Sequence, residues 1–425
     1  MYSTEKTREK VVLISIDKGG TGQRDLDELA QLVDTAGGVA VGRIIQKREA
    51  MHTGHYIGKG KLEEARALVE ETGAEAICAD DELTSSQQSN LFKKLGVRVL
   101  DRTMVILDIF AARAATAEGK AQVELAQYKY RLSHLKGIGE SMSRQAGMAA
   151  HGGVGNRGPG EKKLELDRRH IRRRVEQLAG ELAEIRENRG EARKRRQKNG
   201  VPVVALVGYT NAGKSTLMNA LTGSDVFAED KLFATLDTTT RKKALPGGQD
   251  ALFTDTVGFI HKLPHTLIRA FHATLEELVF ADVLLHVVDY SHDEYRKQMQ
   301  VVEETLKELK IADKPIVTVL NKLDKLGDGG ISELNGIDGP AARVSAKTGA
   351  NIGSLLSRVE EALLDSCKKM ALLVPYAEGA ALAKIHGSCR VELSESREDG
   401  IYMEIVADKG MEEQMGKFSV PSPCS

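Results

Sequence analysis

Apolar and polar positions alternate along the first part of the chain as they do in an α/β domain. Short apolar runs bounded by Gly and polar residues predict strands at residues 11–17, 38–45, 74–80 and 97–101. Amphipathic stretches between these runs predict helices at residues 25–37, 61–73 and 87–95. Strands that alternate with helices are typical of a parallel sheet. We therefore expect residues 1–116 to form a small parallel α/β subdomain.

The apolar spacing changes after this subdomain. Apolar side chains recur at alternating intervals of four and three residues in two stretches, which are Ala121, Leu125, Tyr128, Leu132 and Leu135, and then Ile171, Val175, Leu178, Leu182 and Ile185. A Gly-rich interval, residues 137–161, separates the two stretches. Two such seams joined by a loop predict an antiparallel, coiled-coil-like helical hairpin over residues 117–200.

A second α/β pattern begins at Pro202, after an Asn-Gly pair. Apolar runs typical of buried parallel strands stand at residues 202–208, 251–258, 282–289 and 315–322. They predict an α/β domain over residues 201–364. A last set of short runs, at residues 371–376, 387–396 and 400–408, predicts a small C-terminal α+β module over residues 365–425.

Composition narrows the class of protein. The 425 residues correspond to about three domains. The formal net charge of −1 excludes a uniformly basic nucleic-acid coat, although a local basic patch fits within it. The absence of Trp and 4% aromatic content argue against RNA recognition by stacked aromatic platforms. Four scattered cysteines, no apolar leader and no run of about 20 apolar residues predict a soluble cytoplasmic protein without a membrane anchor.

A phosphate-binding loop follows the first strand of the second α/β domain. It reads Gly208, Tyr209, Thr210, Asn211, Ala212, Gly213, Lys214 and Ser215. Its glycines let backbone N–H groups surround phosphates, and the helix that follows adds a favourable dipole. We expect Lys214 to bridge the β- and γ-phosphates and Ser215 to ligate Mg²⁺.

Two later motifs distinguish guanine from adenine. The sequence Asn321, Lys322, Leu323, Asp324 closes a predicted strand, and Ser345, Ala346, Lys347 follows the next one. The Asp324 carboxylate can accept both N1–H and N2–H of guanine, which adenine does not offer. Asn321 is expected to brace the phosphate loop, and a backbone N–H of the second motif to meet guanine O6. Together with the phosphate loop, these motifs predict a P-loop GTPase domain.

The segment that senses the γ-phosphate reads Asp255, Thr256, Val257, Gly258. Asp255 is expected to hold Mg²⁺ through water, and the Gly258 N–H to contact the γ-phosphate. The next residue is Phe259, where Ras-like proteins carry a water-orienting Gln. Intrinsic GTP hydrolysis should therefore be slow. Faster hydrolysis should depend on a partner or on an extra cation. For the first switch, spacing alone does not choose among four threonines, Thr235, Thr238, Thr239 and Thr240.

The sequence at this point resembles the HflX family of translational GTPases over roughly residues 10–365. The resemblance is carried by GYTNAGKSTL, FATLDTTTR, DTVGFI and NKLD, and most specifically by HGGVGNRGPGE followed by ELDRR. It implies that switch I is Phe233, Ala234, Thr235, Leu236 and Asp237 and that Thr235 ligates Mg²⁺. The family's usual DPT reads Asp237-Thr238-Thr239 here, so a less rigid switch is expected. Nothing is carried over to the last 60 residues.

The resemblance also implies a partner, the large ribosomal subunit, with the Gly-rich tip placed near its peptidyl-transferase centre. The expected ribosome contacts are Gly152, Gly153, Gly155, Asn156, Arg157, Gly158, Arg172 and Arg173. From charge alone, the basic clusters 168–174 and 193–198 are either a solvated helix face or contacts to RNA phosphate. By composition the tip is equally a plain linker. The motif at residues 56–61, YIGKGK, is a packed helix start, an RNA contact or a second nucleotide site.

The sequence thus predicts a GTP-hydrolysing switch that binds the large subunit and splits or rescues stalled or idle ribosomes. Mg²⁺ is the expected cofactor, with K⁺ as a second candidate, and the protein is expected to be monomeric off the ribosome. Two alternatives stay open. One is a GTPase of ribosome assembly or RNA modification, and the other is a non-ribosomal regulatory module that docks a protein through the hairpin.

Overall fold

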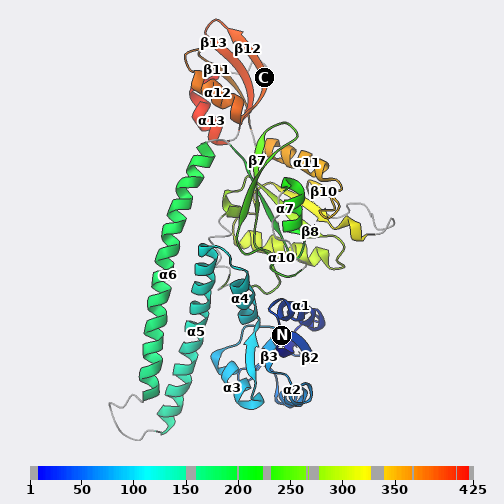
Figure 1. The fold of residues 1–425 in the computed structure, drawn as a ribbon, viewed down its shortest axis with the longest axis vertical. Helices are drawn as coiled ribbons and strands as arrows, with labels where there is room; N and C mark the ends of the chain where they lie inside the picture. The colour runs from blue at the N-terminus through cyan, green and yellow to red at the C-terminus, as the bar shows by residue number, and fades with distance from the viewer. Residues whose placement is uncertain are drawn as a thin grey trace, which may run out of the picture. The chain divides into compact units, whose positions relative to one another are not determined.

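The computed structural model describes residues 8–149, 159–198, 201–223, 231–264, 267, 277–326, 339–365, 368–407 and 409–420 (Figure 1). The chain divides into two compact units. The first is Met1–Ile185 with two later segments, Lys231–Leu236 and Lys262–His272. The second is Arg186–Asp230, Asp237–His261 and Ala273–Ser425. Two short segments that flank the γ-phosphate motif in sequence thus belong with the N-terminal part of the chain.

The first unit contains a four-stranded parallel sheet in the order β2-β1-β3-β4. Its strands are β1 (Lys10–Asp17), β2 (Val39–Lys47), β3 (Ala76–Ala79) and β4 (Arg98–Asp101), and its helices are α1 (Gly22–Thr35), α2 (Lys59–Thr72), α3 (Ser85–Leu95) and α4 (Arg102–Arg113). Thr84 and Gln87 form a capping box at α3, and the Asp101 carboxylate accepts the Met104 N–H at the start of α4. The predicted parallel α/β fold is confirmed for this part of the chain.

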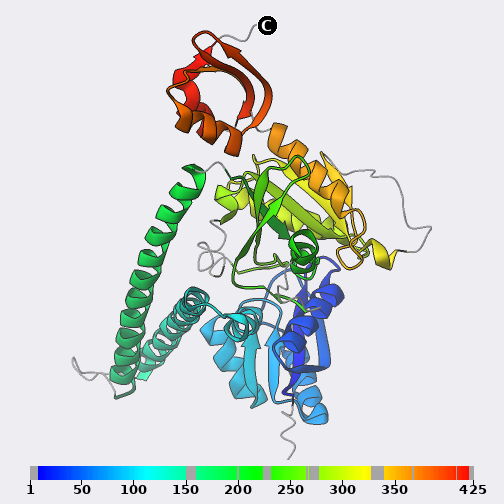
Figure 2. The same cartoon turned by 45° about the horizontal axis from the view of Figure 1, so that its top comes forward.

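Two long helices follow, α5 (Ala117–Ala149) and α6 (Pro159–Lys198), which lie side by side in both ribbon views (Figures 1 and 2). Leu125, Leu178 and Leu182 are buried between them. The neighbouring seam residues Ala121, Tyr128 and Val175 pack against this cluster. Arg174 donates two hydrogen bonds of 2.9 Å to the Glu124 carboxylate across the pair. The spacing of four and three therefore marks the face on which the helices meet.

The second unit contains a six-stranded sheet in the order β10-β9-β8-β5-β7-β6. The strands are β5 (Val203–Gly208), β6 (Thr239–Ala244), β7 (Asp250–Asp255), β8 (Val283–Asp289), β9 (Ile316–Asn321) and β10 (Ala341–Arg343). Only β6, at the edge, is antiparallel to its neighbour among these strands. Helices α7 (Lys214–Thr222), α10 (Tyr295–Glu308) and α11 (Ile352–Asp365) accompany the sheet. The carboxyl ends of β5, β7, β8, β9 and β10 share one edge, where the phosphate loop, the γ-phosphate motif and both guanine motifs stand.

The C-terminal module is an antiparallel sheet in the order β12-β13-β11-β14. Its elements are β11 (Lys368–Val374), α12 (Gly379–Ser388), β12 (Arg390–Arg397), β13 (Gly400–Ala407), α13 (Lys409–Met415) and β14 (Ser419–Val420) (Figure 2). Leu372, Ile385, Met403 and Met411 share its core, so both helices cover one face of the sheet. None of the helices that the structure describes is long and apolar enough to cross a membrane.

Candidate functional site

The phosphate loop connects the end of β5 with the start of α7, as the sequence requires. A Cβ at Gly208 would lie 2.2 Å from the Val287 carbonyl oxygen, and one at Gly213 would lie 2.4 Å from Asn321 Nδ2. Gly213 also has a φ of 92°, which L side chains rarely adopt. The loop can therefore approach its neighbours closely only because both positions are Gly.

Lys214 is buried at the centre of this loop. Its ammonium donates hydrogen bonds to the carbonyl oxygens of Gly208 at 3.1 Å and Tyr209 at 2.8 Å. Burial lowers the pKa of Lys214 to about 8, although the Asp255 carboxylate acts in the opposite direction. A phosphate group would supply the counter-charge that this buried ammonium needs.

Two oxygens suited to Mg²⁺ stand together beside Lys214. The Ser215 hydroxyl donates to Asp255 Oδ2 at 2.7 Å, and Asp255 is buried at the end of β7. Hydroxyl and carboxylate oxygens are ligands that Mg²⁺ prefers. Among the described residues no group of three or more His, Cys, Asp and Glu side chains gathers for a metal, so phosphate oxygens and water would complete the coordination. These residues fit Mg²⁺, which would neutralise phosphate charge.

Thr235, the expected switch I ligand, belongs to the first unit, whereas Ser215 and Asp255 belong to the second. Its neighbour Phe233 is buried, with a left-handed φ of 53°. The Phe233 ring packs edge-on against Phe110 of α4 with a centroid distance of 4.8 Å. Residues 233–236 of switch I thus belong to the first unit, where Phe233 makes an aromatic contact that the sequence motif does not reveal.

The guanine motifs are joined by side chains of Asn321 and Ser345. Asn321 Nδ2 donates to the Ala212 carbonyl at 3.0 Å, and its Oδ1 accepts the Ala346 N–H at 3.0 Å. Ser345 Oγ donates to Asp324 Oδ1 at 2.6 Å. This hydrogen bond lowers the pKa of Asp324, which keeps the carboxylate ionised to accept two N–H groups. The base pocket and the phosphate loop are thus built as one hydrogen-bonded unit.

Asp289 and His286, both on β8, are site residues that the sequence motifs do not reveal. Asp289 Oδ2 accepts from Lys322 Nζ at 2.7 Å and fixes the stem that would cover the base. His286 is buried, and burial together with the nearby Lys214 charge lowers its pKa to about 4. It therefore stays neutral beneath the loop. The only signal in the sequence is the presence of polar residues within an otherwise apolar strand.

The γ-phosphate motif is tied to the phosphate loop through Phe259. The Phe259 N–H donates to the Gly208 carbonyl at 3.1 Å, and its own carbonyl accepts the Thr210 N–H at 2.7 Å. The ring is 2% exposed. Because it is buried and apolar, Phe259 cannot orient an attacking water. A Cβ on Gly258 would lie 2.9 Å from Lys214 Nζ, so this motif sits directly over the lysine.

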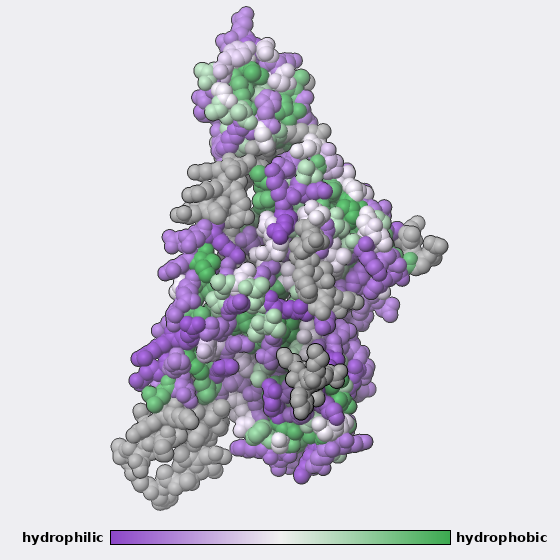
Figure 3. Space-filling model, in the orientation of Figure 1, coloured by the Kyte–Doolittle hydropathy of each residue, from purple (hydrophilic) through white to green (hydrophobic). Residues whose placement is uncertain are grey.

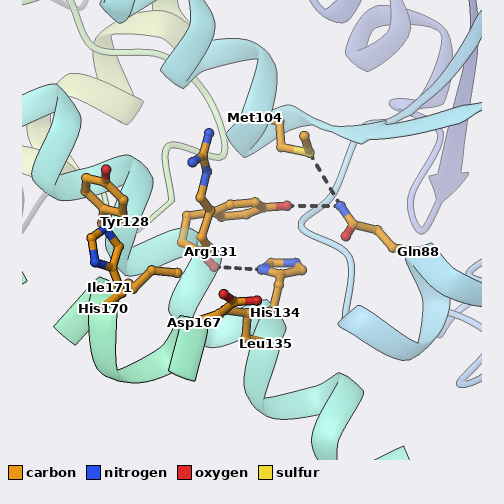
Figure 4. A pocket seen from close by; sticks show the side chains of 10 residues that line it. Gln88, Met104, Tyr128, Arg131, His134, Leu135, Asp167, His170 and Ile171 are labelled. Carbon is orange, nitrogen blue, oxygen red and sulfur yellow. Dashed lines mark hydrogen bonds between the residues drawn. The ribbon is translucent and has the colours of Figure 1, made fainter. Parts of the chain in front are cut away.

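A groove of about 520 Å³ opens in the first unit and is lined by residues of α3, α4, α5 and α6 (Figure 4). Tyr130 donates a hydrogen bond to Asp101 Oδ2 at 2.8 Å and accepts one from Gln88 at 3.1 Å. The two ring nitrogens of His134 lie 3.0 Å and 2.9 Å from the carbonyl oxygens of Tyr130 and Leu83. These contacts attach the first hairpin helix to the N-terminal sheet.

The expected ribosome contacts fall in two groups. Gly152, Gly153, Gly155, Asn156, Arg157 and Gly158 lie outside the described residues. Arg172 and Arg173 are exposed on α6, whose described side chains are mainly hydrophilic (Figure 3). Arg168 and Arg174 of the same cluster instead bind Leu135 O and Glu124. The side chains of the second cluster, 193–198, also lie outside the part of the chain that the structure describes.

The YIGKGK motif has internal partners. Tyr56 is buried and donates to Asp81 at 2.6 Å, and the Gly58 N–H that starts α2 binds Gln46 Oε1 at 2.8 Å. Lys61 pairs with Glu64 at 2.7 Å. These contacts favour the packed helix start over a second nucleotide site.

The fold and this arrangement define the class of protein, a P-loop GTPase. Three family models cover most of the chain: "GTP-binding GTPase N-terminal" matches residues 23–111, "GTP-binding GTPase Middle Region" residues 113–196, and "50S ribosome-binding GTPase" residues 203–322.

Relatives named GTPase HflX match over nearly their full length. The protein of Lacrimispora saccharolytica is 48% identical over 95% of this chain and 94% of its own. Those of Caldanaerobacter subterraneus and Escherichia coli are 43% and 39% identical, covering 99% and 94% of this chain and 96% and 93% of their own. The chain belongs to the HflX family of GTPases, and it hydrolyses GTP to GDP and phosphate.

The buried Lys214 predicts a pH-dependent affinity. Bound phosphate keeps Lys214 protonated. In the free protein Lys214 has a pKa of about 8, so it loses its proton as the pH rises above that value. Binding then requires proton uptake, so GDP affinity should be level below about pH 7 and fall about fourfold by about pH 8.5. Fluorescence titration with labelled GDP measures this. Guanosine, which lacks phosphates, should show no such fall, and a level GDP profile would contradict the assignment.

Asp324→Asn should weaken GTP binding by on the order of 2–5 kcal/mol, because it leaves guanine N–H donors without their charged acceptor. Xanthine nucleotide should be partly accepted, since its C2 carbonyl suits the amide. Lys325→Gln, one residue away and exposed, is the matched control. Equal affinity of the wild-type site for ATP and GTP would show that the guanine assignment is wrong.

Proposed function

We propose that the protein is a GTP-dependent switch of the large ribosomal subunit that splits stalled or idle ribosomes in the cytoplasm. The observation that carries this proposal is the match of the GTPase domain to the family described as 50S ribosome-binding GTPases. GTP would order the Thr235 and Gly258 segments and favour the bound form, and hydrolysis would release the protein.

The hairpin supports an RNA partner. Arg172 and Arg173 are consecutive, exposed residues of α6. Arg168 and Arg174, by contrast, bind the Leu135 carbonyl and the Glu124 carboxylate. Arg side chains bind phosphate through two parallel hydrogen bonds. The contacts of Tyr130 and His134 fix the middle of α5 to the N-terminal α/β subdomain, through Asp101 of β4 and the Leu83 carbonyl.

The alternatives are a role in ribosome assembly or RNA modification and a non-ribosomal docking module. Cosedimentation with purified 70S ribosomes and separated subunits, in GDP, GTP and a non-hydrolysable analogue, separates a ribosomal partner from a protein partner. GTP-dependent sedimentation with mature large subunits supports the proposal. Sedimentation with neither subunit would overturn it in favour of a protein partner.

Arg172→Glu with Arg173→Glu should weaken ribosome binding and lower the slope of log affinity against log salt by about one for each phosphate that the protein no longer neutralises. Lys297→Glu with Lys307→Glu, on exposed positions of α10, changes the net charge equally and should leave binding unchanged. A slope identical to that of the wild type would assign the two arginines to a solvated helix face.

Shortening the tip at residues 153–158 should leave GTP affinity and most ribosome binding intact while abolishing splitting. Glycines would permit a tight path between RNA walls, where any Cβ would clash, and Arg157 could bind rRNA phosphate or stack on a base. Light scattering after mixing with ribosomes measures splitting. A shortened tip that splits at the normal rate would show that this segment is a linker.

Because Phe259 cannot orient water, the large subunit should raise single-turnover hydrolysis by an order of magnitude or more, as partner-supplied groups do in other GTPases. We propose that K⁺ near Asn211, whose φ is 60°, adds positive charge at the phosphates. Exchanging K⁺ for Na⁺ tests this separately. Equal rates in the two salts would remove K⁺ from the mechanism.

A further inference from the structure

Two residues of the GTPase region anchor in the first unit, and both adopt left-handed backbone. Phe233 has a φ of 53° and Lys262 a φ of 54°. The ring of Phe233 packs against Phe110. Lys262 Nζ forms salt bridges with Asp80 and with Asp25 Oδ2, the latter at 2.9 Å, and lies 3.9 Å from Asp81 Oδ1. A non-Gly residue keeps such a backbone only where its surroundings enforce it.

The carboxylates that receive Lys262 form an acidic socket, defined here as Asp25, Asp80 and Asp81. Asp25 is 4% exposed and the Asp80 side chain is fully buried. Arg102, 2% exposed, donates to Asp80 Oδ1 at 2.7 Å and also pairs with Glu28. Arg102 and Lys262 both pair with the fully buried Asp80 carboxylate, and removing one partner of such a buried pair is costly.

The titration of Asp80 reports the same dependence. Burial raises its pKa to about 6, and Lys262 is the largest influence in the opposite direction. Near neutral pH the Asp80 carboxylate therefore owes its charge in part to Lys262. Withdrawing the lysine would leave buried carboxylates facing one another, which is costly. The socket and the segment that carries Lys262 accordingly stabilise each other.

Lys262 stands four residues after Gly258, the glycine of the γ-phosphate motif. That motif is itself attached to the phosphate loop by the two backbone hydrogen bonds of Phe259. It lies over Lys214, whose ammonium binds the loop carbonyls. The segment 258–262 is therefore fixed at both ends, by Phe259 and by Lys262. A γ-phosphate would contact the Gly258 N–H and move this motif, which pulls against the salt bridges of Lys262.

We propose that Lys262 is a positioning residue that discriminates between GTP and GDP. Its salt bridges in the acidic socket hold the γ-phosphate motif where Gly258 lies over Lys214, so part of the binding energy of GTP is spent in moving Gly258. GDP has no γ-phosphate to contact Gly258, so its binding does not include the free-energy cost of moving this residue. Binding of the triphosphate and occupancy of the socket are then reciprocally coupled. The proposal depends on the GTPase assignment alone and is independent of any ribosomal role.

The test uses the full-length protein and Lys262→Met, which keeps the aliphatic stem and removes the charge. Affinities for labelled GDP and a labelled non-hydrolysable GTP analogue are measured by fluorescence titration. The preference for the analogue over GDP should rise by at least about fivefold, the lower range of such couplings, with GDP affinity unchanged. Lys297→Met, an exposed lysine paired with Glu294 on α10, should leave the ratio as in the wild type.

Asp80→Asn tests the other side of the contact. It should raise the same ratio, and the double variant with Lys262→Met should exceed neither single variant, because both remove one interaction. Lys262→Arg should keep the ratio near that of the wild type. Thermal unfolding identifies any variant that fails to fold. If Asp80→Asn or Lys262→Arg does not fold, the affinity ratio of Lys262→Met alone decides the test. A folded Lys262→Met protein with an unchanged or lower ratio would overturn the proposal and leave the salt bridges a purely structural role.

Discussion

The structure depends on burying carboxylates at the carboxyl ends of parallel strands and giving each of them a partner. Parallel strands end at one edge, where loops converge and backbone groups need acceptors. In the second unit, Asp255 ends β7 beside Ser215, and Asp289 ends β8 against Lys322. In the first unit, Asp80 follows β3 and Asp101 ends β4. Asp80 is fully buried and pairs with Arg102 and Lys262, and breaking one side of such a buried ion pair costs about 3–5 kcal/mol, so this carboxylate fixes the position of the cations that neutralise it.

This constraint makes neighbours of elements that are distant in sequence. Ala79 of β3 pairs with Asp101 of β4, so the carboxylates of Asp80 and Asp101 arise on adjacent strands of one sheet edge. Asp101 binds Tyr130 of α5, and Asp80 binds Lys262. The helical hairpin and the segment after the γ-phosphate motif are thus attached one strand apart.

Much of the second unit could be predicted from the sequence, because its signals are local. The phosphate loop and the guanine motifs need particular residue types at fixed spacing, and the structure brings Asn321 against Ala212 and Ser345 against Asp324. The hairpin seam was equally readable, since its periodicity is a property of each helix alone. The edge strand β6, Thr239–Ala244, was missed because it is largely polar. An edge strand with one neighbour buries little and carries no apolar signature.

The contacts of Lys262, Phe233 and His134 could not be predicted for a different reason. Lys262 and Asp80 are 182 residues apart, and His134 and Leu83 are 51 apart. No periodicity or spacing encodes a partner at that distance, and Lys and His are ordinary residues in any helix or loop.

The sequence does contain one clue in Phe259. An apolar side chain after the γ-phosphate glycine cannot orient a water. Its backbone can still form hydrogen bonds with the phosphate loop, and its ring can be buried. Replacing Gln by Phe thus exchanges a water-orienting side chain for a buried ring. The backbone hydrogen bonds of Phe259 hold one end of the segment 259–262, and the salt bridges of Lys262 hold the other.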